Sequence, residues 1–336
     1  NVYIAPEVID RLNNIPTKDM EAYELYLKAK GAGSFSDIGQ NIEWLKQAIE
    51  LDSNFAEAYA LLGKTILFQA GFAQEKNPLD VGIMAKSFLE KALLLDPLNG
   101  IAHGEIAAYS LWFEKDFKET EIHCITAQRL APSYENSYAI YLDLLLSAGR
   151  FHEAISIGTK LIETIGDTPM NRGRNALMWA FNNEEEKMNE NIRQAKQAPN
   201  DILGITESAR ASLIQKQYGQ VLEILDILPD TLQISRVKGL KSIAYYKTGD
   251  IVNHNRELNA LIQKSTETAG GSPSFYIAMI YSSKNNVDEA FRWLEKSFKD
   301  NEIEIYWLKV EPEFESLHNE PRWQVLLDKI GFPKTI

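Results

Sequence analysis

The sequence has few of the residues and motifs that most often reveal a biochemical activity. Its 336 residues contain a single cysteine, Cys124, which excludes an intrachain disulfide framework and any metal site made only of thiolates. The five histidines, at positions 103, 123, 152, 254 and 318, form no H-E-x-x-H pair. The sequence has no G-x-S-x-G motif and no kinase signature. We therefore predict no catalytic residue, no metal site and no cofactor.

Long apolar runs and an excess of positive charge are also missing. No apolar run reaches the roughly 18 residues that a membrane span needs, so we expect no membrane insertion by this chain. The net charge is −12, from 35 Lys and Arg against 47 Asp and Glu. This balance disfavours direct binding to nucleic acid, because such affinity comes largely from cations that neutralise phosphates.

The N-terminal sequence NVYIAPEVIDRL has neither the basic nor the apolar region of a signal peptide, and it does not begin with Met. We expect a processed form or a piece of a longer protein. The compartment and the oligomeric state stay open at this point.

Prolines recur at nearly regular intervals along the chain. Between Pro97 and Pro273, successive prolines stand 35, 37, 30, 30 and 44 residues apart. A period near 34 residues, with helical patterns between the prolines, predicts a repeat made of two helices. No segment shows sustained alternation of apolar and polar residues, so we predict essentially no β-sheet.

The segments between prolines carry apolar stripes at helical spacing. Tyr59, Leu62 and Ile66 share one face of an expected helix, and Ala85 and Ala92 mark the stripe of a second helix. This pattern resembles the tetratricopeptide repeat (TPR), in which an aromatic residue, Leu, Gly and Tyr on the first helix meet Ala, Phe and Ala on the second. The resemblance implies an all-α, TPR-like α-solenoid, a right-handed superhelix of stacked helix-turn-helix pairs that share a continuous core.

About eight pairs fit the pattern. We expect them near 19–53, 56–97, 100–132, 135–166, 170–198, 202–229, 232–265 and 271–302. The sequence divides into a lead-in at 1–18, regular repeats at 19–166, degenerate repeats at 167–265, a last repeat at 266–302 and C-terminal capping helices at 303–336. The pair at 56–97 carries about ten additional residues, AGFAQEKNPL, in its turn.

A Glu-Pro-x-aromatic signal occurs twice near the C-terminus, at 311–314 and 320–323. Because Pro suits the first turn of a helix, where its missing N–H is not needed, each signal predicts the start of a short helix. Phe314 and Trp323 then lie where they cover the exposed face of the last repeat. Terminal repeats need such a cap.

Three segments resemble one bacterial family more closely than a general TPR protein. They are PTKDMEAYELYLK at 16–28, AHGEIAAYSLWFEKDF at 102–117, and WLKVEPEFESL with EPRWQVLL at 307–317 and 320–327. They resemble the C-terminal TPR region of bacterial adenylate-cyclase-like proteins and winged-helix transcriptional regulators, which often follows a TolB-like domain. Both Asp-Pro steps of that family are Glu-Pro here. The resemblance implies a sensory or protein-interaction role and supplies no catalytic residue.

In TPR arrays the first helix of each pair lines the concave face, and this register selects candidate residues for binding a ligand or a peptide. They are Lys64, Phe68, Trp112, Asp143, Trp179, Arg236, Tyr246 and Met279. Their mixture of aromatic and charged side chains suits an extended peptide or a partner helix. For Trp112 and Trp179 the alternative is packing between repeats. We expect His103 and Cys124 to pack in the core.

These observations predict a non-catalytic scaffold for a protein or peptide partner, acting as the sensory or regulatory part of a bacterial signalling or transcription-regulating protein. The alternative is a small-molecule-binding sensor domain coupled to an output domain. A stand-alone enzyme is the third possibility. The identity of the partner stays open.

Overall fold

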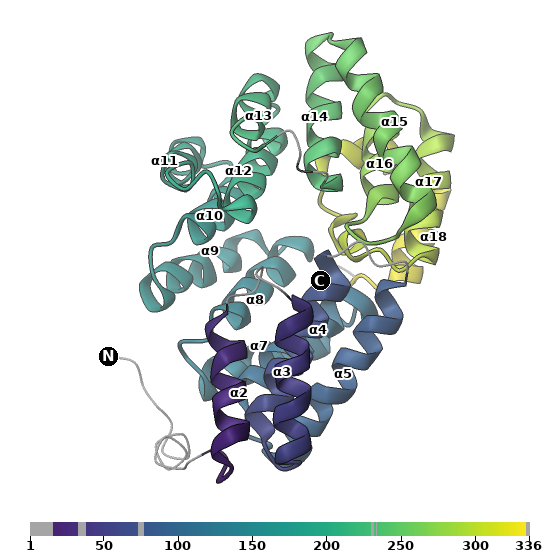
Figure 1. The fold of residues 1–336 in the computed structure, drawn as a ribbon. Helices are drawn as coiled ribbons and strands as arrows, with labels where there is room; N and C mark the ends of the chain where they lie inside the picture. Colours follow the sequence, from purple (N-terminus) through teal and green to yellow (C-terminus); the bar gives the residue numbers. More distant parts are fainter. Residues whose placement is uncertain (1–15, 33–37, 73–76, 230–231, 233, 334–336) are drawn as a thin grey trace. The chain divides into compact units, whose positions relative to one another are not determined.

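The computed structural model describes residues 16–32, 38–72, 77–229, 232 and 234–333 (Figure 1). Most of the predicted lead-in and the centre of the predicted insertion at 70–79 lie outside these residues. Within them all regular structure is helical and no strand occurs, which confirms the predicted all-α class.

The described helices follow one another as eight helix-turn-helix pairs, as the proline spacing predicts. The pairs are α2 (Met20–Gly31) with α3 (Ile38–Leu51), α4 (Ala56–Phe72) with α5 (Pro78–Leu95), α6 (Gly100–Tyr109) with α7 (Phe117–Leu130), α8 (Glu135–Ser147) with α9 (Phe151–Lys160), α10 (Pro169–Phe181) with α11 (Glu185–Ala195), α12 (Ile202–Ile214) with α13 (Tyr218–Leu225), α14 (Ser235–Thr248) with α15 (Ile251–Glu267), and α16 (Pro273–Ser283) with α17 (Val287–Lys299). Two π-helical turns, η1 (Ser110–Glu114) and η2 (Leu161–Ile165), extend α6 and α9.

The chain forms two compact units, and the boundary between them lies inside α8. Unit 1 ends at Tyr141 and unit 2 begins at Leu142. The division into five segments that the sequence suggests remains a prediction. The two units separate compact parts of the chain, whereas the five segments separate regular from degenerate repeats.

Small residues let helices pack closely in both units. In unit 1, a side chain added at Gly63 would place its Cβ 2.6 Å from Leu89 Cδ2, so Leu89 would have to shift at the α4–α5 crossing. In unit 2, a Cβ at Gly173 would collide with the backbone of Gly204, where α10 meets α12. Side chains on these first helices are therefore held on closely packed, regular backbone.

The start of α16 is capped by a residue that follows α17. Ser272 precedes the helix in a left-handed conformation (φ +57°) and makes no side-chain cap of its own. The Glu302 carboxylate instead accepts hydrogen bonds from the N–H groups of Ser274 (2.9 Å) and Phe275 (2.8 Å). Burial raises the pKa of Glu302 to about 7 against the opposing effect of these bonds. This non-local cap fixes the point from which the rest of the chain leaves the last repeat.

Beyond Glu302 the chain forms the predicted helical cap. Its elements are two 3-10 helices, η3 (Ile303–Trp307) and η4 (Pro312–Leu317), and one α-helix, α18 (Pro321–Ile330). Pro312 and Pro321 stand at the first turns of η4 and α18, as the doubled signal predicts. Phe314 is fully buried, with its ring centroid 5.5 Å from that of Phe275 on α16.

The cap contributes to stability through Trp323, which is 7% exposed and lies 6.3 Å from Phe314 between ring centroids. We expect Trp323→Ala to lower the free energy of unfolding by about 3–5 kcal/mol, because it removes a buried aromatic side chain and leaves a cavity. Urea denaturation measures this loss. Val325 on the same helix is 55% exposed, so Val325→Ala is the matched control and should change stability by less than about 0.5 kcal/mol. Equal effects of the two substitutions would show that the cap does not pack on the repeats.

Candidate functional site

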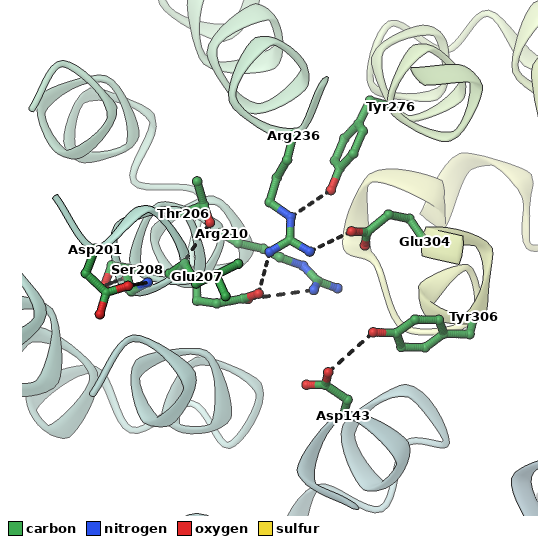
Figure 2. Close-up of polar contacts among 12 residues, drawn as sticks. Asp143, Asp201, Thr206, Glu207, Ser208, Arg210, Arg236, Tyr276, Glu304 and Tyr306 are labelled. Atoms are coloured by element: carbon green, nitrogen blue, oxygen red, sulfur yellow. Dashed lines mark hydrogen bonds and ion pairs between the residues drawn. The ribbon is translucent and has the colours of Figure 1, made fainter. Parts of the chain in front are cut away.

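Residues 303–317, here called the strap, contact the first helices of unit 2. Figure 2 shows two of its residues, Glu304 and Tyr306, facing Arg236 and Asp143. Near its start, the Tyr306 hydroxyl donates to Asp143 Oδ2 on α8 at 3.4 Å. The Trp307 ring stacks on Phe181 of α10, with centroids 6.3 Å apart. Near its end, Ser316 Oγ lies 2.9 Å from Ser282 Oγ on α16. The surface that these helices present to the strap is called the inner face below.

Arg210 on α12 binds the middle of the strap. Its Nε donates to Glu311 Oε1 at 2.7 Å, and a second guanidinium nitrogen binds the same oxygen. The guanidinium carbon lies 3.8 Å from the centroid of the Trp307 ring, which gives a cation–π contact. The side chains of Arg210 and Glu311 are 3% and 1% exposed, so the ion pair is buried.

Arg236 on α14 joins the strap to two helices at once. Its guanidinium pairs with Glu304 on the strap at 2.5 Å and with Glu207 on α12 at 2.5 Å. Its Nε also donates to the Tyr276 hydroxyl on α16 at 3.0 Å. Figure 2 shows Arg236 at the centre of these contacts, with Arg210 and Glu207 beside it. A planar guanidinium with several donors suits such a convergent position.

The helical period of α12 explains why Glu207 and Arg210 act together. They are three residues apart and therefore share one face of the helix. The start of α12 is fixed by Asp201, whose side chain accepts from the N–H of Gly204 at 3.0 Å. Several polar side chains of this closely packed helix are buried together with its apolar ones.

The electrostatics of the inner face divide its carboxyls into two kinds. Burial, with Glu207 nearby, raises the pKa of Asp143 to about 7, although arginines on the neighbouring helices oppose the shift. Glu207 is buried as well, but Arg236, Arg210 and Arg174 hold its pKa below the ordinary value. The difference follows from contact with a guanidinium, which Glu207 has and Asp143 lacks among the hydrogen bonds of the described residues.

A second pair of carboxyls lies on the strap itself. Burial raises the pKa of Glu311 in spite of its contact with Arg210. Burial and the neighbouring Glu311 raise the pKa of Glu313 to about 8. The Oε2 atoms of both residues are buried and have no hydrogen-bond partner among the residues that the structure describes. Two such carboxyls do not ionise independently.

The structure brings together two of the eight candidate residues from the sequence. Asp143 and Arg236 both face the strap, and both interact electrostatically with Glu207. Lys64 lies in unit 1, where its Nζ is 5.1 Å from the centroid of the Tyr134 ring. Phe68 is one turn further along α4, and both side chains are partly exposed.

The other four candidates are in separate places. Trp112 is 8% exposed within η1, and Met279 on α16 is 1% exposed in the core. Trp179 on α10 lies under Lys187 of its own second helix, with Nζ 4.4 Å from the ring centroid. Tyr246 on α14 likewise faces its own second helix, with its ring centroid 5.2 Å from that of His254. Their assignment to a ligand site remains a prediction.

Five of the residues that hold the strap on the inner face were not predicted from the sequence. They are Glu207, Arg210, Glu304, Trp307 and Glu311. One signal was present, namely Glu-Pro at 311–312, where the sequence pattern that this segment resembles has Asp-Pro. Glu311 makes no side-chain cap to η4, and its carboxylate reaches Arg210 instead. The side chain of Glu is longer than that of Asp by one methylene, and here it binds a distant helix and does not cap the helix that it precedes.

Of the two residues predicted to pack in unit 1, Cys124 is buried and His103 is only partly buried. Cys124 is fully buried, and the Nδ1 atoms of His103 and His123 lie 3.0 Å apart between α6 and α7. Within the described ranges, no group of three or more His, Cys, Asp or Glu is arranged to hold a metal ion. A search of the same residues finds no helix whose length and apolarity suffice to cross a membrane.

No protein-family model matches this sequence, and no curated protein matches it. Among solved structures, the chain is similar to one in the APC/C hetero-tetramer Cut9–Hcn1, with 15% identity and a TM-score of 0.56 over 96% of this chain and 58% of that one. It is also similar to the human IFIT1 dimer with m7Gppp-AAAA, with 14% identity and a TM-score of 0.51 over 87% of this chain and 75% of that one. At these identities the likeness shows the fold alone, which is a TPR-like α-solenoid.

The buried pair of Arg210 and Glu311 generates a stability prediction. We expect Arg210→Met to lower the free energy of unfolding by about 3–5 kcal/mol, because it leaves Glu311 buried and unpaired. The double variant Arg210→Met/Glu311→Met should recover most of that loss, since an apolar pair of similar volume replaces a buried ion pair at little cost.

Urea denaturation of the single and double variants measures the coupling between the two side chains. Arg193 is the control, because its pair with Glu190 is exposed and Arg193→Met should change stability by less than about 1 kcal/mol. Losses of equal size at Arg210 and Arg193, or strictly additive effects in the double variant, would contradict a buried pair.

Proposed function

We propose that this chain is a non-catalytic scaffold that binds a protein or peptide partner through the first helices of its repeats. Solenoids of this kind present extended surfaces along stacked first helices, and such surfaces suit extended ligands. The first helices present cationic and aromatic side chains with isolated carboxyls, and in this proposal these side chains bind the ligand.

The observation that carries the proposal is the strap on the inner face of unit 2. It is a segment without repeat character that runs across α8, α10, α12 and α16 and is held by side chains from separate helices. Arg210 and Arg236 bind its carboxylates, and aromatic rings stack along it. The first helices of this chain thus already bind one short segment in the manner expected for a peptide ligand.

The proposed setting is the sensory or regulatory part of a bacterial signalling or transcription-regulating protein. The family resemblance of 16–28, 102–117 and 307–327 supports it. One structural neighbour, Cut9–Hcn1, is a hetero-tetramer, which is consistent with a scaffold role for this fold. Another, IFIT1, was solved with m7Gppp-AAAA. The net charge of −12 here argues against the same kind of ligand, so the proposal includes no direct nucleic-acid binding.

A second candidate function is a small-molecule sensor. A polar hollow of about 570 Å³ lies at the start of α10 and beside α11, and its lining includes Asp167, Arg172, Glu190 and Arg193. This is the part of the chain where the repeat pattern is degenerate. Adjacent carboxylates and guanidiniums suit a charged metabolite, although each already pairs with a neighbour.

Peptide display against the full chain tests the proposed function. Asp143 and Arg236 hold the strap, so the informative substitutions are those of the partly exposed Lys64 and Phe68 in unit 1. We expect selected peptides to bind the unaltered chain and to lose about ten-fold in affinity, or about 1.4 kcal/mol, with Lys64→Glu/Phe68→Ala.

The matched control is Lys118→Glu/Ile125→Ala, which makes similar changes on the exposed surface of a second helix, α7. An equal loss of affinity in this control would show that binding does not use the first helices. A failure to select any peptide, together with a metabolite that raises the melting temperature, would favour the sensor. A capped or uncapped RNA oligonucleotide bound at physiological salt would contradict the exclusion of nucleic acid.

A further inference from the structure

The cluster on the inner face of unit 2 contains more acidic than basic groups. Its carboxyls are Asp143, Glu207, Glu304, Glu311 and Glu313, and its guanidiniums are Arg174, Arg210 and Arg236. Lys247 acts on Glu313 from the rim and donates to the Ser283 carbonyl at 2.8 Å. Even with Lys247 counted, full ionisation leaves this buried region with net negative charge. Unpaired charge in such surroundings is strongly disfavoured, and a bound proton removes it.

The contacts indicate which carboxyls hold protons. Glu207, Glu304 and Glu311 each form an ion pair with Arg210 or Arg236. The remaining two have no guanidinium among their hydrogen-bond partners in the described residues. Asp143 meets the Tyr306 hydroxyl, and the buried Oε2 of Glu313 has no hydrogen-bond partner.

The pKa directions agree with this assignment, because burial raises the pKa of Asp143 to about 7 and that of Glu313 to about 8. The phenols and guanidiniums that face them hold one charge state through this range. Burial raises the pKa of Tyr276, Tyr306 and Tyr218, so these phenols stay neutral. Arg210 and Arg236 stay charged, since their carboxylate partners outweigh the effect of burial.

The two protonated carboxyls act at separate points of the strap. Asp143 contacts Tyr306 in η3, whereas Glu313 belongs to η4 and lies beside the carboxylate that Arg210 binds. A hollow of about 330 Å³, lined by Lys216, Lys247 and Glu315 among others, reaches Glu313 and gives it a route to water. Loss of both protons therefore places uncompensated negative charge at both attachments.

We propose that the strap is a proton-dependent latch, held on the inner face while Asp143 and Glu313 are protonated and loosened when they ionise. Its release uncovers Arg210 and Arg236 on the first helices, and a partner with acidic and aromatic side chains like those of the strap then binds them. This use of the latch rests on the proposed function, whereas the movement of the strap does not.

The sign of the pH dependence follows from linkage. The folded chain holds protons on Asp143 and Glu313 that the unfolded chain releases at an ordinary carboxyl pKa, near 4. The contribution of these protons to the free energy of unfolding is fully present below the pKa of the unfolded chain. It is lost as the pH rises through about 7 and then about 8. This dependence is opposite to that of a carboxylate in an ordinary salt bridge.

Hydrogen–deuterium exchange of the full chain tests the latch. After correction for intrinsic exchange, we expect the amides of 303–317 to lose about ten-fold or more of their protection between about pH 6 and about pH 9, while those of α10 and α12 stay protected. Asp143→Asn/Glu313→Gln removes both titrations and should keep the strap protected at both pH values. The control is Glu302→Gln, because Glu302 has a pKa of about 7 but caps α16, so this variant should keep the pH-dependent opening.

Equal pH dependence of strap protection in the unaltered chain and in Asp143→Asn/Glu313→Gln would overturn the proposal. If that variant does not fold, urea unfolding of Glu302→Gln, which lacks the titration of Glu302, decides instead. The free energy of unfolding must then fall as the pH rises from about 6 to about 9, and a flat or rising curve rejects the latch. Neither measurement uses a partner, so failed peptide binding leaves the latch standing and a static strap leaves the scaffold function standing.

Discussion

Two arginines, the buried Arg210 on α12 and the largely covered Arg236 on α14, determine where the end of the chain lies. Each binds a strap carboxylate, and Arg236 also binds Glu207 and Tyr276, so three helices and the strap meet at one guanidinium. A buried ion pair adds little to net stability compared with an apolar pair of the same size. We interpret these contacts as setting which part of the strap meets which helix, because a shift along the face would leave charges buried without partners.

The apolar part of the strap supplies the stabilisation that the ion pairs lack. Ile305, Leu308, Phe314 and Leu317 are fully buried, and Trp307 lies between Phe181 and Arg210. The last repeat of a solenoid needs its exposed face covered. Here α18 follows the strap, and the strap extends the covered area to earlier helices of unit 2. One segment thus covers the last repeat as a cap and also occupies the face on which a ligand is expected to bind.

The local features of this fold could be read from the sequence because local chemistry produces them. Proline spacing predicts the eight pairs, and Pro312 and Pro321 begin helices where the missing N–H has no cost. The strap could not be predicted in this way. Arg210 and Glu311 are 101 residues apart, and no periodic pattern connects them. Asp143 and Arg236 were placed on the inner face by register alone, which gave no sign that the chain's own segment lies there.

Register is less informative where the repeats are degenerate. Trp179 and Tyr246 were selected at positions equivalent to those of regular repeats, but both rings face the second helix of their own pair. A shift of one residue turns a side chain by about 100° around a helix, since 3.6 residues make one turn. For an aromatic residue in an irregular repeat, composition alone therefore does not show which face of the helix the ring occupies.

The central claim is that the strap lies on the first helices of unit 2 in the folded chain, and disulfide trapping tests it most directly. Ser282 on α16 and Ser316 on the strap have Oγ atoms 2.9 Å apart. In a Cys124→Ser background, the pair Ser282→Cys/Ser316→Cys should form a disulfide under mild oxidation of the native protein, because the side chains already meet. Quantitative formation near pH 6, seen by mass spectrometry of the linked peptides, is the predicted result. Two free thiols in the folded protein after the same mild oxidation would contradict the account.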